Sequence, residues 1–252
     1  MKFLILTNII CLFLLQLFFV QNAYSSDNLK QSLIYVVYAN LGLIKKDILN
    51  VKTFYLENPE FYEIRFNLLS QGSWPEILIG ETQGEGVSEG IVDKNSLNPK
   101  YYRYKELKKN KEKIYEIKFN KNITVGKRIP TYDKNKLTPI TDEMMREVID
   151  PALAFHLISD YANTNKCSRK FKVYDAKRRF DLDFYFISNI NNEIICEIKQ
   201  SKIGGYKIKD SLNPLEIPNV MNIKYVYKNG NFSMKTIKGK NDFLNITIEL
   251  ND

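Results

Sequence analysis

The sequence has little histidine and little cysteine: one histidine and three cysteines occur among 252 residues. A single histidine disfavours metal sites built from histidine and most catalytic centres that use a histidine base. Gly84, Gly86 and Gly90 lack the spacing of a dinucleotide-binding loop, and a flexible or bent strand explains them more simply. The chain also has no internal repeat. We therefore expect no cofactor, no metal site and no catalytic residues, so the chain is not expected to be an enzyme.

The composition is that of a folded protein, with 44% hydrophobic, 13% aromatic and 26% charged residues. The net charge of +8 would suit a polyanionic partner. Most of the cations are lysines, however, and asparagine is also abundant, which is what a strongly AT-rich genome encodes by default. The densest run, Lys108 to Lys113, fits a solvated hairpin tip better than an anionic contact surface. We expect no nucleic-acid partner.

Residues 1–25 have the pattern of a secretory signal peptide. Lys2 is followed by an apolar run from Phe3 to Val20 and by the small-residue site Ala23-Tyr24-Ser25. We expect cleavage after Ser25, with an uncleaved anchor as the alternative. No second long apolar stretch follows, so no membrane span is expected after cleavage.

Export would reduce the number of cysteines in the mature chain from three to two, because Cys11 lies within the predicted signal peptide. Ile10 precedes it where a lipoprotein needs a small residue, so lipidation is not expected. The remaining pair, Cys167 and Cys196, points to a disulfide in an exported protein. Two buried, reduced thiols are the alternative.

Apolar and polar residues alternate along most of the remaining chain, which is typical of half-buried antiparallel strands. Asn229-Gly230 lies between two such segments and is the strongest hairpin signal. The fold class predicted is mainly β, a strongly twisted antiparallel sheet or an open, barrel-like meander with one main helix. The clearest alternating sets are Tyr62, Ile64, Phe66 and Leu68; Tyr115, Ile117 and Phe119; and Phe180, Leu182, Phe184 and Phe186.

One main helix is predicted over about residues 150–162, because Asp150 is a good N-cap and Pro151 follows at the first helical position. A shorter helical turn can precede it at Asp142 and Glu143. We therefore predict one exported domain over residues 26–252. It would contain strands over 32–128, a linker and helix over 129–163, and disulfide-linked strands over 167–250.

Two pairs of residues have the chemistry of a catalytic site, and for both a structural role is favoured. His156 lies one helical turn before Asp160 and could hydrogen-bond to it, but both candidate cysteine nucleophiles are expected to be oxidised. Asp181 and Asp183 share one strand face, where ion pairing with the adjacent Arg178 and Arg179 on a solvated surface explains them better than paired catalytic carboxylates.

Aromatic residues are concentrated in the strand-like segments. Core packing is the simpler interpretation, and the alternative is that some of them line an apolar cavity inside a curled sheet. The set comprises Tyr35, Tyr38, Phe54, Tyr62, Phe66, Tyr101, Tyr102, Tyr104, Tyr115, Phe119, Phe180, Phe184 and Phe186.

The segment from Val173 to Leu182, with Cys167 before it, Cys196 after it and Ile203-Gly204-Gly205-Tyr206 closing it, resembles the signature of an exported proteobacterial family, domain of unknown function 3108. Its motif residues here are Tyr174, Asp175, Lys177, Arg178, Arg179, Phe180, Asp181, Gly205 and Tyr206. The resemblance implies an envelope-exposed, mostly β protein with no established catalytic residues. We interpret the motif as structural, a disulfide-closed hairpin with a charged face. The family's usual glycine is Ala176 here, so a turn that needs positive φ at this position would be strained.

These observations favour a non-enzymatic periplasmic protein that binds an apolar or lipid-like ligand in the concavity of its sheet. The alternative is a structural or assembly protein of the cell envelope that docks other proteins through a basic face or an edge strand. A hydrolase that uses Asp181 and Asp183 is the least favoured hypothesis.

Overall fold

The computed structural model of the chain describes residues 29–41, 44–70, 81–94, 96–108, 110–120, 124–207, 219–240 and 245–251. The predicted signal peptide, residues 1–25, lies outside the described residues. The elements within these ranges are β1 (Leu29–Leu41), β2 (Ile44–Glu57), β3 (Phe61–Ser70), β4 (Thr82–Asp93), β5 (Ser96–Lys108), β6 (Lys111–Phe119), β7 (Thr124–Ile129), η2 (Lys134–Lys136), η3 (Glu143–Met145), α3 (Pro151–Ser159), η4 (Ala162–Thr164), β8 (Lys170–Tyr174), β9 (Arg179–Ile190), β10 (Glu193–Gly204), β11 (Val220–Lys228), β12 (Asn231–Lys240) and β13 (Asn245–Asn251).

The strands form a single antiparallel sheet in the order β7-β6-β5-β4-β3-β2-β1-β13-β12-β11-β10-β9-β8. The first and last strands, β1 and β13, pair in its middle, for example at Tyr35 and Leu250. The chain therefore winds outward from β1 to one edge at β7, crosses to the opposite edge at β8, and winds back to β1. The predicted mainly β fold class is confirmed.

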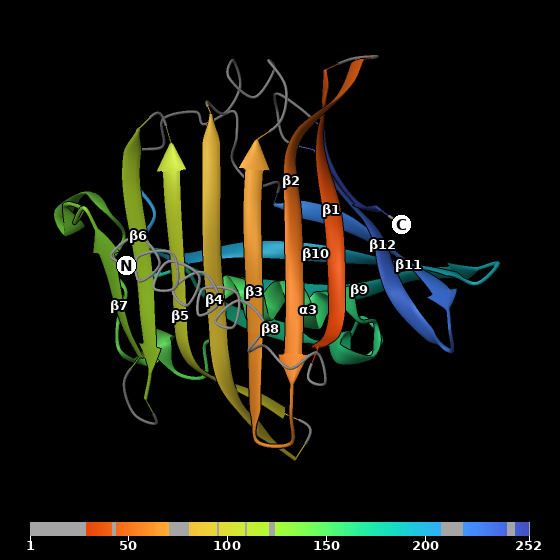
Figure 1. Cartoon of the computed structure of the whole chain (residues 1–252), viewed down its shortest axis with the longest axis horizontal. Coiled ribbons are helices and arrows are strands. Elements are labelled where there is room, and N and C mark those ends of the chain that lie inside the picture. The colour runs from red at the N-terminus through yellow and green to blue at the C-terminus, as the bar shows by residue number, and fades with distance from the viewer. Residues whose placement is uncertain are drawn as a thin grey trace, which may run out of the picture.

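The sheet curls so that its two halves face each other, with β9 and β10 running crosswise behind β1–β6 (Figure 1). The two edge strands, β7 and β8, come close to each other: a Cβ placed on Gly126 of β7 would lie 2.3 Å from the Tyr174 hydroxyl of β8. They are not paired in the described sheet. Ile149 covers part of the free edge of β8: its amide donates to Lys172 O at 2.9 Å, and its carbonyl accepts from the Tyr174 amide at 3.0 Å. The sheet is thus curled and left open.

Helix α3 lies between the two halves of the sheet and contacts β3 and β4 on one side and β8 and β12 on the other. It begins as predicted, since Asp150 Oδ1 accepts from the amides of Ala152 and Leu153 at 3.0 and 2.9 Å. Its buried residues are Leu153, Ala154, Leu157 and Ile158, which form one core cluster with strands of both halves.

The predicted end of the helix at about residue 162 is wrong, because the α-helix stops at Ser159. Asp160 is extended and forms an isolated bridge with Ser233 of β12. The Tyr161 amide then donates to Phe232 O at 3.2 Å. Pairing with a strand edge replaces the last helical turn.

Two predicted turns and the predicted helical turn are confirmed. Asn229 and Gly230 both have positive φ, 54° and 90°, and join β11 to β12. The lysine run lies at the tip of the β5–β6 hairpin, where Asn110 has φ 59°. The helical turn at Asp142 and Glu143 is the 3-10 helix η3.

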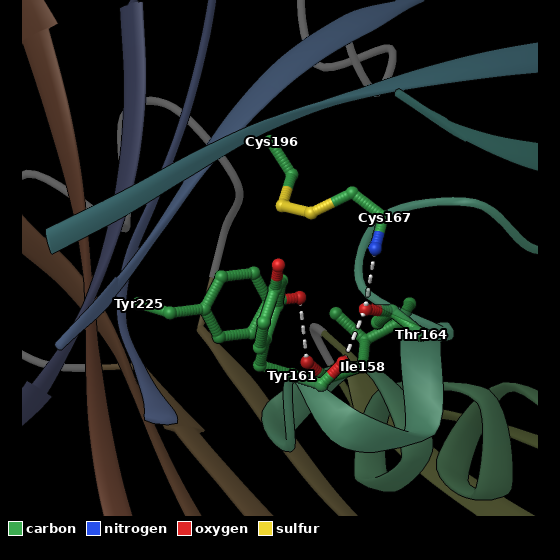
Figure 2. The surroundings of a disulfide bond; sticks show 6 residues. All are labelled: Ile158, Tyr161, Thr164, Cys167, Cys196 and Tyr225. Atoms are coloured by element: carbon green, nitrogen blue, oxygen red, sulfur yellow. Dashed lines mark hydrogen bonds between the residues drawn. A yellow bond between two sulfur atoms is a disulfide. The ribbon is translucent and has the colours of Figure 1, made fainter. Parts of the chain in front are cut away.

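The disulfide joins Cys167, in the loop after η4, to Cys196 of β10, as predicted, and both cysteines are buried (Figure 2). Two hydrogen bonds fix the nearby C-terminal end of the helical segment. The Tyr225 hydroxyl donates to Ile158 O at 2.9 Å, and the Cys167 amide donates to Thr164 Oγ1 at 3.2 Å (Figure 2). The helix is therefore attached at this end to β10 and β11.

Reduction of this disulfide is expected to lower the free energy of unfolding by about 3 to 4 kcal/mol, because it releases a loop that spans 29 residues. Urea unfolding followed by circular dichroism, with and without reductant, measures the change. The double variant Cys167→Ala/Cys196→Ala is the control, since its midpoint should not respond to reductant. Two titratable thiols in the denatured, unreduced protein would contradict the assignment.

Candidate functional site

An apolar cavity of about 320 Å³ lies between helix α3 and the concave face of the first half of the sheet. This volume falls at the lower end of the range of about 300 to 1,000 Å³ that is typical of small-molecule sites. Its walls are mainly aliphatic and aromatic. Those from the strands include Leu33, Tyr35, Val51, Ile64, Phe66, Leu68, Tyr102 and Tyr104, and those from the helix include Ala152 and Phe155.

Two of the polar residues that line the cavity already have main-chain partners. Thr53 Oγ1 donates to Leu33 O at 3.5 Å, and Ser159 Oγ donates to His156 O at 2.6 Å. Because these hydroxyls are satisfied within the protein, they do not demand a polar ligand. The cavity therefore offers mainly apolar contacts, with Gln31 and His156 as further polar side chains in its wall.

His156 stacks on Tyr55, with ring centroids 3.9 Å apart. Burial lowers the pKa of His156 to about 4, although the nearby Glu57 carboxylate acts in the opposite direction. The hydrogen bond that His156 could make to Asp160 is not formed, and Asp160 Oδ1 instead accepts from the Ala162 amide at 2.8 Å. His156 is thus a neutral side chain of the cavity wall at pH 7.

The glycines of β4 leave room for aromatic rings of the neighbouring strands. A Cβ on Gly86 would lie 2.2 Å from the Phe66 ring, and one on Gly90 would lie 2.5 Å from the Tyr62 ring. These contacts replace the predicted explanation of strand flexibility with a steric one. With Gly86 between them, the rings of Phe66 and Tyr104 stack with centroids 5.7 Å apart.

A buried polar network lies at the N-terminal end of helix α3. Ser88 Oγ donates to Asp150 Oδ2 at 2.8 Å, and both residues are 0% exposed. Burial raises the pKa of Asp150 to about 6, although the bonds from Leu153, Ser88 and Ala152 counteract the shift. The Tyr62 hydroxyl is close to Ser88 and Asp150 but has no hydrogen bond of good geometry. This network joins β3 and β4 to the helix.

The family motif forms the turn between β8 and β9. Asp175 Oδ1 accepts from the amides of Lys177 and Arg178 at 3.0 and 2.6 Å, and its carboxylate pairs with the Arg178 guanidinium at 2.7 Å. Ala176 has φ 68°, so this turn does need the left-handed conformation that favours glycine. Gly205 has φ 79°, and a Cβ there would lie 1.9 Å from Lys177 O.

The predicted ion pairing of Asp181 with Arg179 is present, but the predicted solvated surface is wrong. Arg179 and Asp181 are 3% and 6% exposed and pair at 2.6 Å. The segment around η3 covers them, since Arg179 Nε donates to Met144 O at 2.9 Å. Burial alone would raise the pKa of Asp181, but the bonds to Lys170 and Arg179 hold it below its usual value.

The remaining motif residues pack around this turn. Tyr174 is buried in a second core cluster with Ala176, and the partly buried Phe180 packs against the main cluster. The Tyr206 amide donates to Thr138 Oγ1 at 3.1 Å.

Five of the thirteen aromatic residues considered for a cavity do line it: Tyr35, Phe54, Phe66, Tyr102 and Tyr104. Others, such as Tyr62, Phe119 and Phe184, are core residues, and Phe186 is 52% exposed. The helix side of the cavity was not predicted. The signal for it was the composition of α3, because a helix that is apolar nearly all round must be enclosed.

Among the residues with described coordinates, no group of three histidine, cysteine or carboxylate side chains could hold a metal ion. Within the same part of the chain, no helix is long and apolar enough to cross a membrane.

The fold and cavity together define a curled β-sheet protein with an internal helix and an apolar cavity beside it. The chain belongs to the family described as "Protein of unknown function (DUF3108)", whose model matches residues 45–191. No curated protein matches the chain. Among solved structures it is similar to the beta-barrel-like protein of domain of unknown function DUF1849 from Brucella abortus, with 11% identity and a TM-score of 0.45, over 88% of this chain and 95% of that one.

The partly buried histidine of the cavity wall should make stability depend on pH. The pKa of His156 is about 4 in the folded protein, below the ordinary histidine value of 6.5 that is expected in the unfolded chain. The unfolded chain therefore binds more protons between these values, and stability falls as the pH drops from 6.5 to 4. In the variant His156→Phe, which keeps a ring against Tyr55, this loss of about 2 to 3 kcal/mol should disappear.

Urea unfolding of both proteins at intervals from pH 7 to pH 4 checks this expectation. Asp150, whose pKa is raised to about 6, contributes the opposite slope over part of the same range, but it is present in both proteins and cancels in their difference. A difference between the two free energies that stayed constant with pH would contradict the burial of a neutral His156.

Proposed function

We propose that this chain is a non-enzymatic protein that binds an apolar or lipid-like ligand in the cavity beside helix α3. The observation that carries the proposal is the cavity itself, about 320 Å³ with almost entirely apolar walls. A cavity of this kind gains free energy from apolar ligands by removing their surface from water, at about 25 cal/mol per Å². A polar metabolite would lose its hydrogen bonds to water there and find few replacements.

Export to the periplasm is part of the same proposal. It is supported by the signal-like pattern of residues 1–25 and by the buried disulfide, a bond that forms and persists in oxidising compartments. An exported carrier of this type would hold apolar molecules that cannot cross the aqueous periplasm alone.

A matched pair of variants tests the cavity. Leu68 lines it, whereas the adjacent Leu69 is 48% exposed on the opposite face of β3. Leu68→Trp should fill part of the cavity and weaken binding of an environment-sensitive apolar fluorophore by about tenfold or more, while Leu69→Trp should bind like the wild type.

Fluorescence titration of the three proteins measures this, and mass spectrometry of an organic extract of periplasm-purified protein identifies any stoichiometric ligand. Saturable binding that is equal in both variants would place the ligand elsewhere. A clean extract together with no saturable binding would refute the proposed function.

A second candidate, docking of other envelope proteins, is favoured by the outer part of the β9–β10 hairpin. Three consecutive residues of β9, Tyr185, Phe186 and Ile187, are 46%, 52% and 53% exposed, and Ile190 is 63% exposed. Successive residues of a strand point to opposite faces, so a strand that covers a core exposes only every second residue. Because consecutive apolar residues are exposed here, both faces of this part of the hairpin are open to solvent.

A photo-crosslinking residue at Phe186 should give a reproducible adduct in cells if this hairpin docks a partner. The same residue at Ile34 of β1, which is 39% exposed, is the control and should give only background. Mass spectrometry of the adduct identifies the partner. Identical patterns from the two positions would count against docking through the hairpin.

A further inference from the structure

A row of side chains leads from the cavity across the sheet toward its β7 edge. Register places Phe66 opposite Gly86, Gly86 opposite Tyr104, Tyr104 opposite Tyr115, and Tyr115 opposite Arg128. Ring centroids are 5.7 Å apart between Phe66 and Tyr104 and 5.8 Å apart between Tyr104 and Tyr115. The Arg128 guanidinium carbon lies 5.6 Å from the Tyr115 ring centroid. The row therefore begins in the cavity wall and ends at a cation.

The Arg128 guanidinium does not use all of its hydrogen-bond donors. Its Nη1 donates to Pro130 O at 3.0 Å, but its buried Nε has no hydrogen-bond partner among the residues that the structure describes. A buried N–H of a charged group without an acceptor is costly, and an anion is the strongest acceptor it can be offered.

Further cations gather near Arg128 at the motif turn. Arg178 and Lys207 both lie close enough to act on the half-buried Lys177, and among the described residues Asp175 is the carboxylate that does so. That carboxylate already pairs with Arg178 at 2.7 Å. Within the described part of the chain, no carboxylate forms an ion pair with Arg128, Lys177 or Lys207.

The electrostatics agree with this arrangement. Burial and the positive charges of Arg178 and Arg128 lower the pKa of Lys177, more than Asp175 raises it. Tyr115, Arg128 and Lys177 are all partly exposed, so a ligand group can reach them from solvent. The cluster has an excess of positive charge that a bound anion would neutralise.

We propose that the ligand of this protein is an anionic amphiphile, whose apolar part occupies the cavity and whose carboxylate or phosphate binds Arg128 and Lys177. The proposal rests on the proposed function, because the apolar part needs the cavity. Neighbouring strands are about 4.8 Å apart, so Arg128, two strands beyond Tyr104, lies about 10 Å from the cavity wall, within reach of an extended head group.

Three probes that share a dodecyl-length alkyl chain and differ in the head group test whether the protein prefers an anion: dodecanoate, dodecyl phosphate and 1-dodecanol. Displacement of a bound apolar fluorophore gives their affinities, measured below the micellar concentration of each anion and below the solubility limit of the alcohol. The wild type should bind at least one of the anions about tenfold or more tightly than the alcohol, as expected for charge-assisted hydrogen bonds. The preferred anion distinguishes a carboxylate from a phosphate.

Arg128→Gln and Lys177→Gln should each reduce affinity for the preferred anion by about tenfold and leave affinity for the alcohol unchanged. Lys127→Gln is the matched control, since Lys127 is exposed and adjacent in β7, and it should behave like the wild type. Unfolding midpoints verify that each variant is folded, and Lys177→Gln serves alone if Arg128→Gln does not fold.

Equal affinity of the wild type for the anions and the alcohol would overturn this inference and leave the proposed function standing. An equal loss for anion and alcohol in both variants would also overturn it, because that pattern is structural. If none of the three probes displaces the fluorophore from the wild type, this inference fails. If the fluorophore itself shows no saturable binding and the organic extract is clean, the proposed function fails as well.

Discussion

Enclosure of helix α3 by the curled sheet is the contact on which the rest of the structure depends. Leu153 is 0% exposed, and the helix packs on strands from both halves of the sheet. A short helix with this composition is not stable alone in water, so the sheet must curl around it. Its two ends are attached to different parts of the sheet, through Asp150 and Ser88 at one end and Tyr225 at the other. The disulfide adds a covalent link beside the second attachment.

The cavity follows from a mismatch in length between the helix and the strands. Nine helical residues extend about 14 Å, whereas the 13 and 14 residues of β1 and β2 extend about 40 Å or more. The helix therefore covers only part of the concave face, and large side chains from the strands line what it leaves uncovered. One side of the helix, from Pro151 to Ser159, forms the opposite wall of this space.

Local patterns predicted the parts of this fold that local chemistry decides. Alternation gave the strands, Asp150-Pro151 gave the helix start, and Asn229-Gly230 gave a hairpin, because each depends on neighbouring residues. The helix end and the burial of Arg179 depend on segments distant in sequence. The same holds for the cavity: aromatic residues marked five of its wall positions, but which face each ring occupies depends on how the sheet curls. Arg128 had no local signal at all.

The positive charge of the chain indicates a ligand only where cations are held together in a partly buried place. A net charge of +8 spread over exposed lysines says little about partners, because water and salt screen such charges. Arg128 and Lys177 differ, since they are partly buried. Among the described residues that act on Lys177, the cations Arg128, Arg178 and Lys207 outnumber the carboxylate of Asp175. Holding like charges together in a partly desolvated site lowers stability, and pairing with acidic side chains would have been the simple remedy. The fold instead leaves Arg128 Nε without an acceptor beside a row of rings that begins in an apolar cavity. An anion carried on an apolar chain removes the repulsion and fills the cavity at once, which a free anion or a neutral lipid cannot do.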